Sequence, residues 1–160
     1  MANPSKLLNR TGMSVLLILA ILVGGCSLIS KQTTLTLEEQ QVNDIIKNAN
    51  ASTQTEQPRL QATGVDMHDG FIHVIVEYLK EDGSKIEGSY NVSLAVLDGI
   101  IQAEISSVDL PGLTLSQQEI EQIANKIAID FAAAPSQLGG RIEVLSIAVT
   151  ENHIQMVVRM

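Results

Sequence analysis

Apolar residues recur at helical spacing near the start of the chain, over residues 37–49. The positions that share one face there are Val42, Ile45, Ile46 and Ala49. This spacing predicts a short amphipathic helix, and Thr36 with Glu39 matches a capping box at its start. The polar residues 50–58 that follow predict a loop.

Four apolar stretches then alternate with turn residues. They span residues 60–67, 71–79, 86–97 and 100–108, with Asp69-Gly70, Asp82-Gly83 and Asp98-Gly99 between them. Asp-Gly is among the commonest two-residue connections of β-hairpins. The pattern therefore predicts a four-stranded antiparallel meander, which Pro111 and Gly112 end.

A second helical pattern covers residues 116–134 and is longer than the first. Its apolar stripe contains Ile120, Ile123, Ile127 and Phe131. Ser116 and Glu119 form another capping box, and Pro135 ends the helix. Residues 142–149 and 153–160 predict two closing strands.

The order of helix and strands occurs twice, and the two occurrences align. Residues 35–46 match residues 113–124 at an offset of 78 with five identities in twelve positions. Residues 60–78 match residues 142–160 at an offset of 82 and agree in apolar or polar class at 16 of 19 positions. The alignment predicts an internal duplication.

The predicted fold class follows from these patterns. We expect an α+β fold built from an internally duplicated helix-plus-antiparallel-sheet unit, with two helices packed on a curved meander sheet. The first repeat would span residues 35–112, and the second, shorter helix-hairpin repeat residues 113–160. Residues 35–160 have the size of one compact domain.

Charge and composition exclude one class of partner. The 160-residue chain carries 18 acidic and 10 basic residues, and its net charge at pH 7 is −8. Trp is absent, and the aromatic residues are two Phe and two Tyr. Because phosphate neutralisation needs clustered Lys and Arg, and single strands need stacking aromatics, we expect no nucleic-acid partner.

The N-terminal segment has the layout of a secretory signal. Lys6 and Arg10 precede an apolar run over residues 13–23, and Gly24 and Gly25 then lead to Cys26, the only cysteine. Even extended to Ile29, this run is shorter than the roughly 20 residues that span a bilayer core. The segment therefore predicts export.

The residues Leu22-Val23-Gly24-Gly25-Cys26 resemble the lipobox of bacterial lipoproteins. The resemblance implies that residues 1–25 are a signal peptide, that residues 26–34 are a tether, and that Cys26 carries lipid. The anchor would lie on the outer face of the cytoplasmic membrane or on the outer membrane. An uncleaved membrane anchor and an ordinary cleaved signal with a free mature chain are the alternatives.

The strand pattern suggests more apolar surface than two helices cover. On the 71–79 stretch, apolar residues lie on both predicted faces. Either the sheet curls on itself or dimerises, or an apolar ligand fills part of the space. The residues expected to line or back such a site are Val74, Val76, Ile120, Ile123, Ile127 and Phe131.

Side-chain chemistry for catalysis, metal binding or a cofactor is not apparent in the sequence. His68, His73 and His153 do not form a symmetric ligand set under the alignment. Glu119 and Glu121 are two residues apart on the predicted helix and face different directions. We therefore expect a non-enzymatic protein with no catalytic residues, no metal and no cofactor.

The helix that opens with Leu-Thr-Leu, followed by strands around an Asp-Gly turn, resembles small envelope lipid-binding proteins of the LmeA type and tubular lipid-binding domains. The resemblance implies a groove between helix and sheet for acyl chains. The leading hypothesis is a membrane-anchored envelope lipoprotein that binds a lipid or other amphiphile. The alternative is a structural or protein-interaction module of the envelope that docks a partner or forms a homodimer through an apolar sheet face.

Overall fold

The structure is a computed structural model that describes residues 31–52, 60–80, 82–135 and 142–160. The compact unit considered below is Gln32–Met160. The predicted signal peptide, the lipobox and Cys26 lie outside the described residues, so their roles stay predictions. No helix among the described residues is both long enough and apolar enough to cross a membrane.

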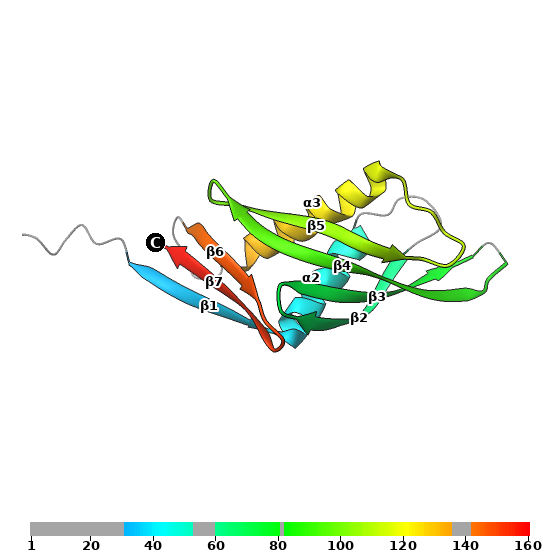
Figure 1. The fold of residues 1–160 in the computed structure, drawn as a ribbon, viewed down its shortest axis with the longest axis horizontal. Helices are drawn as coiled ribbons and strands as arrows, with labels where there is room; N and C mark the ends of the chain where they lie inside the picture. The colour runs from blue at the N-terminus through cyan, green and yellow to red at the C-terminus, as the bar shows by residue number, and fades with distance from the viewer. Residues whose placement is uncertain (1–30, 53–59, 81, 136–141) are drawn as a thin grey trace, which may run out of the picture. The chain divides into compact units, whose positions relative to one another are not determined.

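Two helices and seven strands make up the described part of the fold (Figure 1). In chain order they are β1 (Gln32–Glu38), α2 (Glu39–Ser52), β2 (Leu60–His68), β3 (Phe71–Leu79), β4 (Lys85–Leu97), β5 (Ile100–Asp109), α3 (Gln117–Ala133), β6 (Glu143–Val149) and β7 (His153–Arg159). All strand pairs are antiparallel, in one sheet ordered β2-β3-β4-β5 and a second ordered β1-β7-β6. The α+β class and the four-stranded meander are therefore confirmed.

Two-residue turns join β2 to β3 and β4 to β5, as Asp69-Gly70 and Asp98-Gly99 predicted, whereas the connection from β3 to β4, which contains Asp82-Gly83, is longer. Gly70 has φ 89°, and at the β4–β5 turn both Asp98 and Gly99 have positive φ, 53° and 77°. Two consecutive positive φ values are the signature of a type I′ turn, whose twist matches that of the flanking strands. The chain therefore reverses without splaying the strands.

Strand β1 corrects the prediction for residues 26–34. Residues 32–34 belong to β1 and not to a tether, and β1 pairs with β7 from Gln32 opposite Arg159 to Glu38 opposite His153. Leu35 and Leu37 alternate with threonines, a period-two pattern that suits a strand. The second sheet is consequently a three-stranded sheet rather than a lone closing hairpin.

The first helix begins two residues later than predicted, at Glu39. Thr36 lies inside β1, so the predicted capping box with Glu39 is wrong. The Gln41 side chain instead accepts a hydrogen bond of 3.0 Å from the Glu38 backbone N–H. This contact satisfies one of the backbone donors that a helix start leaves unpaired.

The second capping box is confirmed at the start of α3. Ser116 Oγ accepts from the Glu119 N–H at 3.3 Å, and Glu119 Oε2 accepts from the Ser116 N–H at 2.7 Å. The hydrogen bonds from Ser116 hold the pKa of Glu119 below its ordinary value. Glu121 accepts from Gln117 at 3.1 Å, so the two glutamates have separate local partners.

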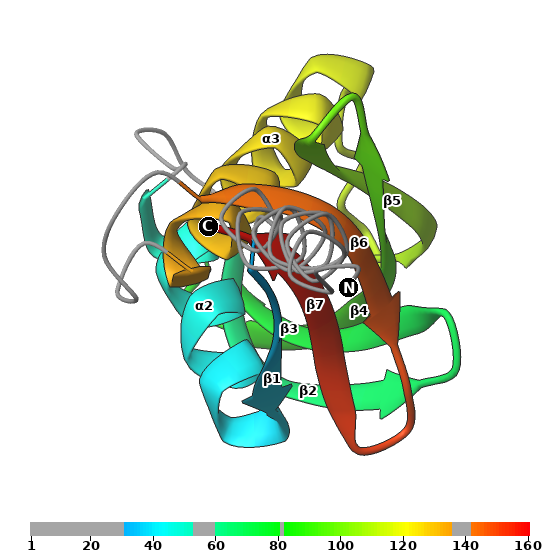
Figure 2. The same ribbon diagram turned by 90° about the vertical axis from the view of Figure 1, so that its left-hand side faces the viewer.

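One hydrophobic cluster joins both helices and both sheets. Packing places α2 against β2, α3 against β5, and the two helices against each other (Figures 1 and 2). The residues with no exposed surface include Val42, Ile46, Ile72, Val74, Val76, Val92, Ile127, Phe131, Ile154, Met156 and Val158. Helix stripes and the inward faces of both sheets therefore share a single core.

The outer face of the four-stranded sheet is more polar than predicted. Phe71 and Ile75 lie half-buried on β3, where Phe71 pairs with His68 and Ile75 pairs with Gly64 and Ser89. His73 lies between them on the same face and pairs with Asp66 and Asn91. The second face of β3 is thus an apolar stripe one strand wide rather than an apolar sheet face.

A buried polar pair crosses the core between α2 and β4. Asn50 has no exposed surface and Tyr90 is 1% exposed. Asn50 Nδ2 donates to the Ile46 carbonyl at 3.0 Å and to the Tyr90 hydroxyl at 2.8 Å, and that hydroxyl lies 3.1 Å from Asn50 Oδ1. Because unpaired polar groups are costly inside proteins, the pair fixes how α2 sits against the sheet.

Candidate functional site

A hollow of about 780 Å³ opens beside strand β2, next to the C-terminal half of α2. Its lining combines apolar and polar side chains: Lys47, Asn48, Ala51, Leu60, Gln61, Ala62, Thr63, Glu77, Tyr78, Leu79 and Lys85. Ligand sites are typically clefts of about 300–1,000 Å³ with an apolar lining and a few polar groups. In size and lining the hollow fits that description.

The alternation of β2 sets which of its side chains reach the core. Leu60 and Ala62 are buried, whereas Gln61 and Thr63 between them are exposed. A β-bulge lies at Thr63, because Ala62 pairs with Val76 while Gly64 pairs with Ile75. The edge strand therefore bends at the hollow.

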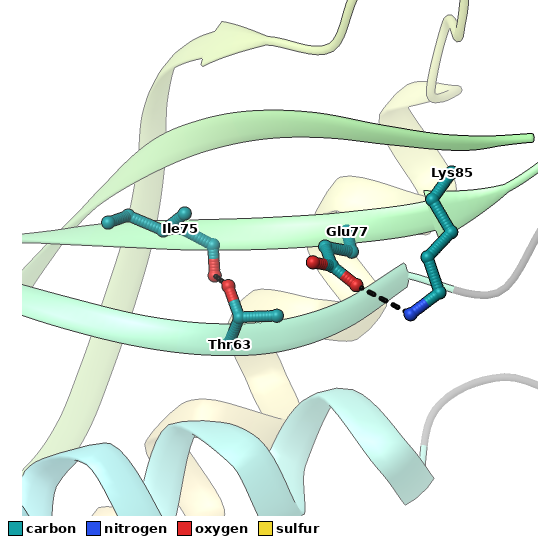
Figure 3. Close-up of polar contacts among 4 residues, drawn as sticks. All are labelled: Thr63, Ile75, Glu77 and Lys85. Carbon is teal, nitrogen blue, oxygen red and sulfur yellow. Dashed lines mark hydrogen bonds and ion pairs between the residues drawn. The ribbon is translucent and has the colours of Figure 1, made fainter.

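The Thr63 side chain is fixed at this bulge (Figure 3). Its hydroxyl donates a hydrogen bond of 3.2 Å to the Ile75 carbonyl on β3. The bulge leaves that part of the strand ladder irregular, and the hydroxyl supplies a partner for the carbonyl. The wall of the hollow formed by β2 and β3 is thus held by a side-chain contact as well as by the ladder.

The charges at the hollow include two lysines and one glutamate. Lys85 Nζ lies 3.1 Å from Glu77 Oε2 (Figure 3), an exposed ion pair of small energetic value. Lys47 is half-buried on α2 and forms no ion pair with any residue that the structure describes. The described lining residues therefore carry one net positive charge, in a chain of net charge −8.

The tyrosine at the hollow serves the fold. Tyr78 is 2% exposed, and its hydroxyl donates to the Pro111 carbonyl in the segment after β5. This contact ties the middle of the meander to the segment that leads to α3. The lining of the hollow as a whole is suited to holding a molecule by apolar contact and charge.

The sequence-predicted lining residues lie elsewhere. Val74, Val76, Ile123, Ile127 and Phe131 belong to the packed hydrophobic cluster, and Ile120 is half-buried on α3. The lining of the hollow contains none of these six. The sequence did not indicate the hollow because no single periodic stretch supplies its lining, which comes from the end of α2, the edge strand β2 and the adjoining ends of β3 and β4.

The three histidines are far from forming one cluster. His68 Nε2 lies 3.2 Å from Asp66 Oδ2, and its ring stacks on Phe71 with centroids 4.8 Å apart. His73 Nδ1 is 2.8 Å from Asn91 Oδ1, and His153 Nε2 is 2.8 Å from Gln155 Nε2 in the other sheet. Among the described residues, no three His, Cys, Asp or Glu side chains are grouped as metal ligands.

Comparison with protein-family models, with curated proteins and with solved structures finds no match to this chain.

Proposed function

We propose that the chain is an exported, non-enzymatic envelope lipoprotein, anchored through Cys26, whose domain binds a lipid or similar amphiphile in the hollow beside β2. The observation that carries the binding proposal is the hollow itself, about 780 Å³ with a partly apolar lining and Lys47 at its side. This location differs from the space between the helices and the sheet, which side chains of the core occupy.

The lining favours an amphiphile with an anionic group. Leu60, Ala62 and Leu79 offer apolar contact for a hydrocarbon chain. Lys47 offers a positive charge that no described carboxylate neutralises. Because charge attraction is stronger near low-dielectric protein than in bulk water, an anionic headgroup would be held beside Lys47.

The alternative function, docking of a protein partner through an apolar sheet face, has weaker support. The stripe of Phe71, Ile75 and Leu79 on the outer face is one strand wide. Stable protein interfaces have a broad, fully buried core with a polar rim. The hollow is therefore the better candidate site.

We also propose that the fold arose by duplication of one unit. The β2–β3 hairpin is irregular at Thr63 and the β6–β7 hairpin at Leu145, positions that are 82 residues apart, as in the sequence alignment. Helices α2 and α3 begin at residues 39 and 117, an offset of 78. The copies differ before the helix, where Leu35 and Leu37 lie in β1 and Leu113 and Leu115 lie outside the strands.

The anchor is tested by the variant Cys26→Ser. Because the thiol would carry the acyl chains, we expect this variant to lose incorporation of labelled palmitate and to leave the membrane fraction. The wild-type chain expressed in the same bacterium is the control. Unchanged labelling and unchanged fractionation of Cys26→Ser would reject the lipoprotein assignment.

The binding site is tested by filling the hollow. Ala51 lines the hollow and is exposed on α2, so Ala51→Trp should occupy the space with little effect on the core. Purified full-length protein is extracted with organic solvent, and the extract is examined by mass spectrometry. We expect a lipid that copurifies with the wild-type protein to be less abundant in the extract of Ala51→Trp.

The matched control is Ala132→Trp, an exposed alanine on α3 that does not line the hollow. This variant experiences the same detergent and the same nonspecific lipid, so it should retain the enriched species. Equal lipid content in wild type, Ala51→Trp and Ala132→Trp would reject binding in the hollow.

A further inference from the structure

Two large aliphatic side chains are exposed at the turn between β4 and β5. Leu97 is 57% exposed and Ile100 is 66% exposed. They form the last cross-strand pair of the hairpin, so both lie on the same face, next to Asp98 and Gly99. Tight turns are normally polar, and a pair of exposed aliphatic residues at one calls for an explanation.

The β4–β5 turn lies at the same end of the domain as the start of β1. A Cβ placed on Gly99 would be 3.6 Å from the Glu143 side chain at the start of β6. Glu143 and Gln32 both pair with Arg159, one on each side of β7. Figures 1 and 2 show the turn on the same side of the domain as the start of β1 and the end of β7.

The chain between the lipid attachment point and this end is short. Six Cα–Cα steps separate Cys26 from Gln32. Fully extended, they reach roughly 20 Å at about 3.5 Å per step. If Cys26 carries the anchor, Gln32 stays within that distance of it, which is about half the thickness of a typical bilayer, about 40–45 Å.

We propose that Leu97, Ile100 and Met160, here called the anchor face, rest on the bilayer that holds the Cys26 lipid, with Leu97 and Ile100 inserted between the headgroups. Met160 follows the last residue of β7 and is 45% exposed. The inference rests on the proposed function, because the lipidated Cys26 supplies the tether that brings this end to the membrane. Inserting these side chains into the bilayer removes apolar surface from water, which is favourable. The tether already holds the domain at the membrane, so most of the cost of association is removed.

Charge at the anchor face gives no separate attraction to anionic lipid. Arg159 Nε is paired with Glu143 Oε2 at 3.0 Å, and Asp98 adds a negative charge at the turn. These residues thus carry no surplus of positive charge. The contact should therefore form on neutral phosphatidylcholine and should depend little on salt.

Fluorescence quenching by brominated lipid tests the proposal, since the chain contains no tryptophan. Full-length lipidated Ile100→Trp is reconstituted in phosphatidylcholine vesicles with and without bromine on the acyl chains. We expect the brominated lipid to quench most of the fluorescence of Ile100→Trp. Leu97→Trp should be quenched in the same way, so either variant can be used if the other folds poorly.

The matched control is Val108→Trp. Val108 is 39% exposed, does not line the hollow and is the next-to-last residue of β5, whereas Ile100 is the first residue of that strand. The control is thus an exposed aliphatic residue at the far end of the same strand, and we expect bromine to leave its emission unchanged.

Emission from Ile100→Trp that is insensitive to bromine would overturn the anchor face. Equal quenching of Ile100→Trp and Val108→Trp would also overturn it, because the contact would then lack orientation. An Ile100→Trp signal that changes with protein concentration and not with bromine would indicate a second copy of the chain and would count against the bilayer. Palmitate labelling of the same preparations separates the two failures: labelled but unquenched protein rejects the anchor face alone, and unlabelled protein rejects the lipoprotein assignment.

Discussion

Replacing Phe131 by alanine is expected to lower the free energy of unfolding by about 3–5 kcal/mol. Phe131 has no exposed surface and lies in the cluster that joins both helices to both sheets. Its removal would leave a cavity that the surrounding strands cannot fully close. The change is measured by urea unfolding of the full-length protein in detergent, followed by circular dichroism.

Ile129→Ala provides the matched control on the same helix. Ile129 is 62% exposed, so its truncation should change the free energy of unfolding by no more than about 0.5 kcal/mol. If Phe131→Ala were as mild as Ile129→Ala, the space around Phe131 would have room to rearrange. That result would favour the ligand site between helices and sheet that the sequence pattern predicts.

Sequence patterns predicted the meander well because the residues that determine its strands and turns are close together in the chain. The predicted stretches 71–79 and 86–97 differ from β3 and β4 by at most one residue at each end. Asp-Gly pairs fix where the chain turns, and runs of β-branched residues between them fix the strands. The start of α3 was equally well specified, because Ser116 and Glu119 satisfy each other's backbone groups within a single turn.

Strand β1 could not be recognised by the same reasoning. Residues 32–38 contain only two buried or half-buried leucines, and their strand partner is β7, more than 100 residues later in the chain. The Thr36 and Glu39 pair offered a competing local explanation as a helix cap. The strand forms instead because β1 is in register with β7 over seven residue pairs, and the backbone hydrogen bonds and side-chain contacts of that ladder outnumber the two groups that a cap satisfies.

The site residues depended on packing that no periodicity encodes. The predicted ligand-lining residues have the most regular helical and strand spacing, and such regularity is what a buried core requires. The hollow is lined instead by residues such as Lys47 and Ala51 and by both faces of the bulged strand β2. The sequence pattern also predicted Asn50 as the first residue of a polar loop. Asn50 is instead buried, because its side-chain amide forms a hydrogen bond with Tyr90, 40 residues away.

The hydroxyl of Tyr90 should make the stability of the protein fall at high pH. Burial raises the pKa of Tyr90 from its ordinary value of 10.0 to about 12, and the hydrogen bond to Asn50 opposes part of that shift. Below the unfolded pKa, both the folded and the unfolded chain keep the phenol proton. Between the two pKa values the unfolded chain releases the proton while the folded chain holds it, so rising pH favours unfolding.

The expected loss of unfolding free energy is about 2 kcal/mol between roughly pH 10 and pH 12, at about 1.4 kcal/mol per pKa unit. Tyr90→Phe separates this effect from the titration of lysines and of other groups, because it keeps the ring and removes the proton. At neutral pH, Tyr90→Phe should cost about 1–2 kcal/mol for the lost hydrogen bonds to Asn50. Urea unfolding of both proteins across this pH range gives the difference between them, which should shrink and then change sign as the wild type loses stability. Parallel curves at all pH values would mean that the Tyr90 phenol titrates alike in the folded and unfolded chains, and that the contact between Asn50 and Tyr90 is open to water.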